Sequence, residues 1–174
     1  VFPKNVVTDM FYTYQDIAVK DREERQNYDC ILKRGVTVLQ LDSRSEIRPD
    51  YIKSFKCTIT GNCGNVFDPS TGHCPQPATL TKTYDISGDR FKAKRFLFTI
   101  YFFLGADNVS DITLTTLSTD TADKVVKSLS FENVHMVKGK MTIYKGPFLS
   151  THSSASFIID SPTIPDSGFS TEFE

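Results

Sequence analysis

Apolar and polar residues alternate with period 2 along much of the chain. In the stretch 54–60, Phe55, Cys57 and Ile59 alternate with serine, lysine and threonine, the pattern of a strand with one buried face. A first strand with alternating buried rings is expected at Met10–Tyr14. Segments rich in Val, Ile, Thr, Phe or Tyr and bounded by turn formers predict further strands at Ile31–Leu41, Asp111–Leu117, Val125–Phe131, Lys140–Tyr144 and Ala155–Ile159.

One segment, Phe96–Leu104, is apolar on both faces. It is far shorter than the roughly 18 apolar residues of a membrane-spanning helix, so it predicts a strand at the centre of a sheet. We expect its alternate residues Phe96, Phe98, Ile100 and Phe102 to line one side of the core.

The predicted strands follow one another without intervening helices, separated by turns rich in Gly, Pro, Asn and Asp. This order predicts an all-β fold, an antiparallel β-sandwich of about eight or nine strands. The charged segment Asp16–Asn27 has no apolar stripe and is expected to be a solvated loop or a turn of helix. We expect one domain over residues 1–160, with 1–28 as a candidate remnant of a preceding domain.

Residues 161–174 form a polar tail punctuated by Pro and Gly that retains Ile164, Phe169 and Phe173. Two interpretations stay open. The tail is either a frayed terminus or an extended segment that pairs with a sheet edge of its own or a neighbouring subunit.

The charge balance narrows the range of partners. Twenty Lys and Arg against 21 Asp and Glu leave a formal net charge of −1, so there is no overall field that would attract nucleic acid. The small basic cluster Lys92, Lys94 and Arg95 is expected to solvate the entry of the apolar strand that follows it. No basic segment followed by an apolar one begins the chain, so any targeting segment is expected to have been removed or never supplied.

The four cysteines, Cys30, Cys57, Cys63 and Cys74, permit two disulfides in any of three pairings, or buried free thiols. Their wide spacing does not match the close cysteine pairs of zinc sites. We therefore expect no metal, and the redox compartment stays open, with oxidising conditions favoured.

Catalytic motifs are not apparent. His73, His135 and His152 lie apart from any recurring acid–base spacing, and the common nucleophile, phosphate-loop and metal motifs do not occur. We expect a protein that is not an enzyme and holds no cofactor. Asn108 begins an Asn-Val-Ser glycosylation sequon. The absence of Trp argues against a flat sugar-binding platform, although Met10–Tyr14 could supply one.

Several segments, taken in chain order, resemble the fimbrillin-like proteins of Bacteroidetes, which are subunits and anchor or tip components of surface fimbriae. The segments are Met10–Val19 followed by Ile31–Leu41, the Gly-rich turn Ile59–Gly72, and the strands Phe96–Leu104, Asp111–Leu117 and Val126–Leu149. The lipid-bearing N-terminal cysteine of that family is not in the sequence, and four internal cysteines depart from the family's pattern.

The resemblance implies a transthyretin-like β-sandwich, export as a lipoprotein and polymerisation by exchange of strands between subunits. It predicts a structural or adhesive subunit at the cell surface or outer membrane, or a secreted one, whose partners are other fimbrial subunits and host or bacterial surface ligands. A second hypothesis is a secreted, disulfide-bonded module that binds a carbohydrate, a lipid or a host protein.

Overall fold

A computed structural model describes residues 7–18, 27–92, 94–151 and 158–160 of the chain. The described residues form eleven strands and one short 3-10 turn, Asp89–Phe91. The strands are β1 (Phe11–Tyr12), β2 (Lys33–Arg34), β3 (Thr37–Asp42), β4 (Ile52–Gly61), β5 (Cys63–Gly64), β6 (Leu80–Asp85), β7 (Leu97–Leu104), β8 (Val109–Asp120), β9 (Val125–Val137), β10 (Met141–Lys145) and β11 (Ile158–Asp160).

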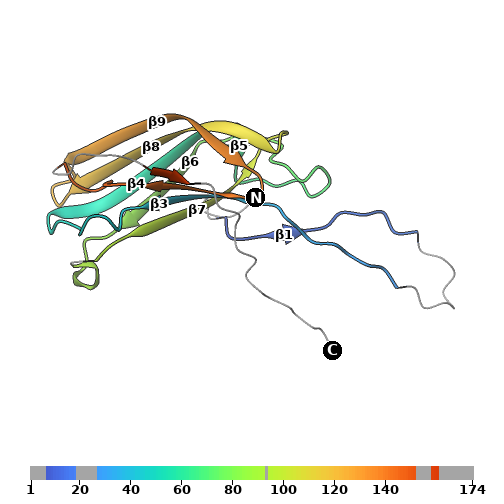
Figure 1. The fold of residues 1–174 in the computed structure, drawn as a ribbon, viewed down its shortest axis with the longest axis horizontal. Helices are drawn as coiled ribbons and strands as arrows, with labels where there is room; N and C mark the ends of the chain where they lie inside the picture. The colour runs from blue at the N-terminus through green and yellow to red at the C-terminus, as the bar shows by residue number, and fades with distance from the viewer. Residues whose placement is uncertain (1–6, 19–26, 93, 152–157, 161–174) are drawn as a thin grey trace.

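Two sheets pack face to face, which confirms the predicted all-β sandwich (Figure 1). One sheet has five strands in the order β11-β10-β3-β7-β5, and the other has four in the order β6-β4-β8-β9. The two-residue strands β1 and β2 pair separately. The apolar strand β7 lies inside its sheet, between β3 and β5, as its two-sided apolar pattern predicts.

The core forms where the alternating residues of the two sheets meet. Phe55 of β4 stacks on Phe98 of β7 with ring centroids 4.2 Å apart, and Phe131 of β9 meets Tyr144 of β10 at 5.1 Å. Phe98, Ile100 and Phe102 are buried as predicted, whereas Phe96 precedes the strand and is only partly buried. Each face of the sandwich is thus defined by the period-2 pattern.

The pairing is not wholly antiparallel. β3 and β10 run parallel, with Met141 opposite Val38 and Lys145 opposite Asp42. The number of strands is also higher than predicted, partly because Ile31–Leu41 is interrupted at Gly35 and Val36 to give β2 and β3. Gly35 lies close under Met10 and Phe67, so its missing side chain allows this approach. Of the segment Asp16–Asn27, the described residues contain no helix.

Residues 8–18 and 27–34 extend from the sandwich as an arm, drawn in blue in Figure 1. β1 and β2 pair at its base, where Phe11 lies opposite Arg34. Arg34 forms an ion pair with Asp9 at 3.0 Å and also stacks over the ring of Phe11. Six large apolar or aromatic side chains on the arm are exposed: Phe11, Tyr14, Ile17, Tyr28, Ile31 and Leu32.

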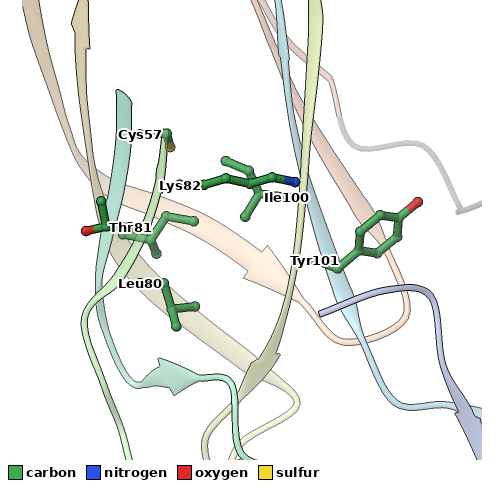
Figure 2. A pocket seen from close by; sticks show the side chains of 7 residues that line it. Cys57, Leu80, Thr81, Lys82, Ile100 and Tyr101 are labelled. Carbon is green, nitrogen blue, oxygen red and sulfur yellow. The ribbon is translucent and has the colours of Figure 1, made fainter. Parts of the chain in front are cut away.

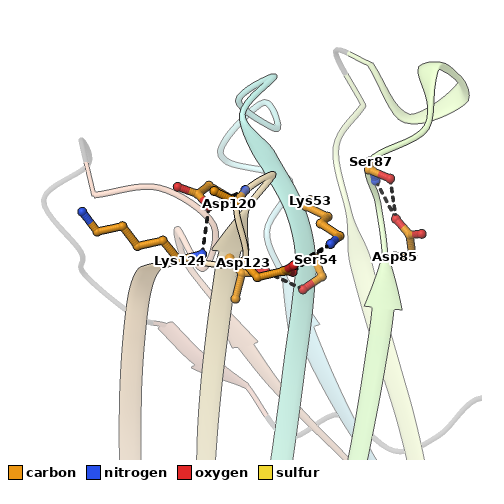
Figure 3. Close-up of polar contacts among 9 residues, drawn as sticks. Lys53, Ser54, Asp85, Ser87, Asp120, Asp123 and Lys124 are labelled. Carbon is orange, nitrogen blue, oxygen red and sulfur yellow. Dashed lines mark hydrogen bonds and ion pairs between the residues drawn. The ribbon is translucent and has the colours of Figure 1, made fainter.

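At one end of the four-stranded sheet, carboxylates in the turns accept hydrogen bonds from groups a few residues away (Figure 3). Asp120 accepts hydrogen bonds from the backbone N–H groups of Ala122 and Lys124, both at 2.9 Å. Lys53 contacts Asp123 at 2.8 Å, and this hydrogen bond raises the pKa of the lysine. Ser87 hydrogen-bonds Asp85 and lowers the pKa of that carboxyl. These groups satisfy one another and stabilise the turns.

Candidate functional site

One side of β7 is open in the first half of the strand. β7 pairs with β3 from Leu97 to Phe102, but on its other side β5 reaches only Phe103 and Leu104. An isolated bridge joins Val7 to Tyr101 on the same strand. Among the described residues, no other strand pairs with Leu97 or Thr99 on the side away from β3. We call the stretch that has no partner on this side, residues 97–100, the open edge of β7.

The backbone of Thr99 points out of this edge. Its carbonyl oxygen accepts hydrogen bonds from Lys82 Nζ and Tyr84 Oη of β6, each at 3.1 Å, so it cannot face β3. In an antiparallel pair, both backbone groups of a residue face the same side and the side alternates along the strand. The N–H of Thr99 therefore also faces outward, whereas that of Ile100 faces β3.

Two side chains of β6 thus take the place of a neighbouring strand. Figure 2 shows Lys82 extending from β6 towards β7, with Ile100 and Tyr101 on opposite faces of β7. Cys57, Ile59, Leu80 and Ile100 line the apolar gap between the two sheets at this point. The gap holds only about 10 Å³, roughly the room for one water, so it is no pocket for a small molecule.

Burial governs the ionisable groups beside the open edge. It raises the pKa of the Cys57 thiol to about 12 and lowers the pKa of the Lys82 amine. The Cys57 thiol stays protonated at neutral pH and is a poor nucleophile. The lowered pKa of Lys82 reflects the cost of holding its charge in a partly buried place beside Thr99.

The four cysteines are free thiols in the structure. Cys57, Cys63 and Cys74 are buried, and Cys30 is exposed on the arm. Burial also raises the pKa of Cys63 to about 12, with the nearby Cys74 adding to the effect. Cys74 Sγ lies 3.2 Å from the Gln76 carbonyl oxygen.

The structure does not bring the histidines together. His135 contacts Asp111 across β8 and β9 at 3.0 Å on an exposed surface, while His73 lies in a loop and lines a surface cleft. His152 lies outside the described residues, as do the tail residues Ile164, Phe169 and Phe173. Within the described part of the chain, no group of three or more His, Cys, Asp or Glu side chains is placed to hold a metal ion.

Asn108 is exposed just before β8 and lies at the rim of the same cleft as His73. The described residues also include no helix with the length and apolar character of a membrane span.

Sequence reasoning missed the residues that shape the open edge. β6 reads Leu-Thr-Lys-Thr-Tyr-Asp, in which only Leu80 and Tyr84 are large and apolar. The only local indication of an edge strand is that these two apolar residues share one face of the segment, with polar residues between them. The pairing of Lys82 and Tyr84 with Thr99 depends on contacts between two sheets, which no local pattern predicts.

Comparisons with known proteins place the chain in no family. No family model matches it, and no curated protein matches it. Among solved structures it is similar to a "putative cell adhesion protein" from Bacteroides ovatus, with 12% sequence identity and a TM-score of 0.44. The match covers 79% of this chain and 49% of that protein, so the chain spans about half its length.

Proposed function

We propose that the chain is a non-enzymatic structural or adhesive subunit of a fimbria-like assembly at the cell surface, joined to its neighbours by strand pairing. The observation that carries the proposal is the open edge of β7. There, the outward carbonyl oxygen of Thr99 accepts hydrogen bonds from two side chains rather than from a neighbouring strand. Unpaired strand edges are the usual sites of strand addition.

An added strand would find both main-chain partners and apolar contacts at this edge. Its backbone would replace the side-chain donors of Lys82 and Tyr84 at Thr99. Its alternate side chains would pack on Leu80 and Ile100 at the mouth of the gap. Main-chain bonds would supply affinity and the apolar contacts would set the register.

The candidate donor is the tail, whose Ile164, Phe169 and Phe173 are spaced among polar residues. Export as a lipoprotein and location in the outer membrane belong to the same proposal and rest on the resemblance to fimbrillin-like proteins alone.

The test compares the full chain with a version truncated after Asp160. We expect the full chain to self-associate in sedimentation velocity and the truncated chain to stay monomeric. The truncated chain is then titrated into a fluorescent peptide of residues 161–174, with a scrambled peptide as the control. The anisotropy of the native peptide should rise at protein concentrations at least about tenfold lower than those needed for the scrambled peptide.

Two results would overturn the proposal. In one, the full chain stays monomeric at high concentration and the peptide fails to bind. In the other, the truncated chain associates as strongly as the full chain, which would make the tail a frayed end.

A secreted binding module is the second candidate. It is favoured by a separate observation, a polar cleft at the base of the arm, which does not involve the open edge of β7.

A further inference from the structure

A surface cleft of about 420 Å³ opens where the arm meets the sandwich. Five separate parts of the chain build it. They are β1 with Tyr12, β2 with Lys33, the loop before Cys74 with Thr71 and His73, the loop before β8 with Asn108, and Lys138 directly after β9. A second cleft of about 190 Å³ adjoins it and shares Tyr12, Lys33 and Thr71. The two together form an elongated polar surface.

The cleft carries uncompensated positive charge. Arg34, also in its lining, is neutralised by Asp9, which accepts two hydrogen bonds from it at 3.0 and 3.1 Å. Lys33 and Lys138 form no ion pair with any described residue, and neither cleft is lined by Asp or Glu. The nearby Asp68 is engaged by the backbone N–H and the hydroxyl of Ser70. Two lysines therefore face a site without an acidic partner.

Aromatic rings lie beside these charges. The Tyr12 ring packs edge-on against Phe67 with centroids 4.8 Å apart, which fixes its orientation. Lys138 Nζ lies 5.2 Å from the centre of that ring and 3.2 Å from its hydroxyl oxygen, and it also bonds the Gly72 carbonyl. Gly72 has φ 74°, and a side chain there would collide with Tyr12 Oη. Lys138 and the ring are thus positioned before any ligand arrives.

The remaining lining groups suit a ligand rich in hydroxyls. The side chains of Ser70, Thr71 and Asn108 can each donate and accept hydrogen bonds. Tyr14, in the adjoining cleft, is 61% exposed. Within the described part of the chain, His73 Nδ1 is buried without a hydrogen-bond partner, which is costly for a polar atom. Exposed tyrosine rings offer a flat apolar face with a polar edge.

We propose that this cleft binds an acidic saccharide, a sugar chain that carries carboxylate or sulfate groups. The anionic group lies between Lys33 and Lys138, a sugar ring packs on the exposed tyrosine surface, and the hydroxyls bind the side chains of Thr71 and Asn108. A nucleic acid fits less well, because two lysines on a chain of net charge −1 give too weak a field.

The test is calorimetric titration of the full chain with three tetrasaccharides. Oligogalacturonate presents carboxylates, a heparin fragment presents sulfates, and maltotetraose is neutral. We expect one or both acidic probes to bind at least about tenfold more tightly than the neutral one, with affinity falling between about 50 and 250 mM NaCl. The preferred acidic probe identifies the anionic group.

Matched lysine variants locate the site. Lys33→Gln and Lys138→Gln should each weaken binding of the acidic probe by about three- to tenfold. Lys124→Gln, which removes the same charge at the far end of β9, should leave it unchanged (Figure 3). Among the described residues, the exposed Lys33 side chain forms no hydrogen bond or ion pair that the substitution would remove, so Lys33→Gln tests binding even if Lys138→Gln unfolds. The proposal fails if the acidic probes bind no better than maltotetraose, or if Lys33→Gln has no more effect than Lys124→Gln.

Discussion

Replacing Phe98 by alanine tests whether the predicted centre of the sandwich stabilises it. Phe98 is 2% exposed, and its ring contacts three others: Phe55 at 4.2 Å, Tyr84 at 4.8 Å and Phe96 at 5.5 Å. Phe→Ala in a core costs about 3–5 kcal/mol. Each aromatic pair adds about 0.5–1.5 kcal/mol beyond its buried area. Because Phe98 links both sheets, we expect a loss of about 4 kcal/mol or more.

The assay is urea unfolding followed by far-UV circular dichroism. The neighbouring Leu97→Ala is the matched control, because Leu97 lies on the same strand but is 43% exposed. It should cost less than about 1 kcal/mol. Equal m-values for the three proteins would show that the changes reflect stability. A loss below about 1 kcal/mol for Phe98→Ala, or an equal loss for Leu97→Ala, would refute the assignment of β7 to the core.

Three further outcomes are expected. In the native protein a thiol reagent should modify Cys30 alone, and it should reach all four cysteines only after unfolding. Burial shields the other three thiols and raises the pKa of Cys57 and Cys63 to about 12. Rapid labelling of two or more cysteines in the native protein would contradict this. Hydrogen bonds from Arg44 lower the pKa of Asp42, so the ionised carboxylate stabilises the fold. This contribution is complete above about pH 4 and is lost as the pH falls through the lowered pKa. In urea melts the wild type should lose more stability on acidification than Asp42→Asn, and equal losses would rule out this contribution. Glu46 accepts hydrogen bonds from the backbone N–H groups of Leu149 at 2.7 Å and Ser150 at 3.2 Å. Glu46→Ala should therefore lower the free energy of unfolding by about 1–3 kcal/mol and speed amide exchange at residues 149–150. Unchanged exchange at these two residues would contradict the prediction.

The sequence was sufficient for the fold class, because the fold class depends on local periodicity. The alternation at Phe55, Cys57 and Ile59 predicts β4, and the two-sided apolar run predicts the interior position of β7. Pairing partners are a different matter. β3 and β10 lie about a hundred residues apart in the chain and run parallel, and the alternation of each strand is the same whichever direction its neighbour takes.

The candidate sites were beyond prediction for a similar reason. The sequence marked Met10–Tyr14 and Asn108 as separate features, and the fold alone places Tyr12 beside Lys138, 126 residues away. Likewise, Thr99 is one polar residue within an apolar strand, and its outward backbone becomes evident only when Lys82 and Tyr84 are seen to bind it. Local patterns predict elements, whereas sites arise where distant elements meet.

The central claim is that the open edge of β7 accepts a further strand, and amide hydrogen exchange at Thr99 tests it most directly. The chain truncated after Asp160 is measured by NMR with and without the peptide of residues 161–174. The account predicts that the peptide slows exchange at Thr99 by at least about tenfold and leaves Ile100, already bonded to β3, unchanged. Unaltered exchange at Thr99 with saturating peptide, or protection confined to another edge such as β9, would contradict it.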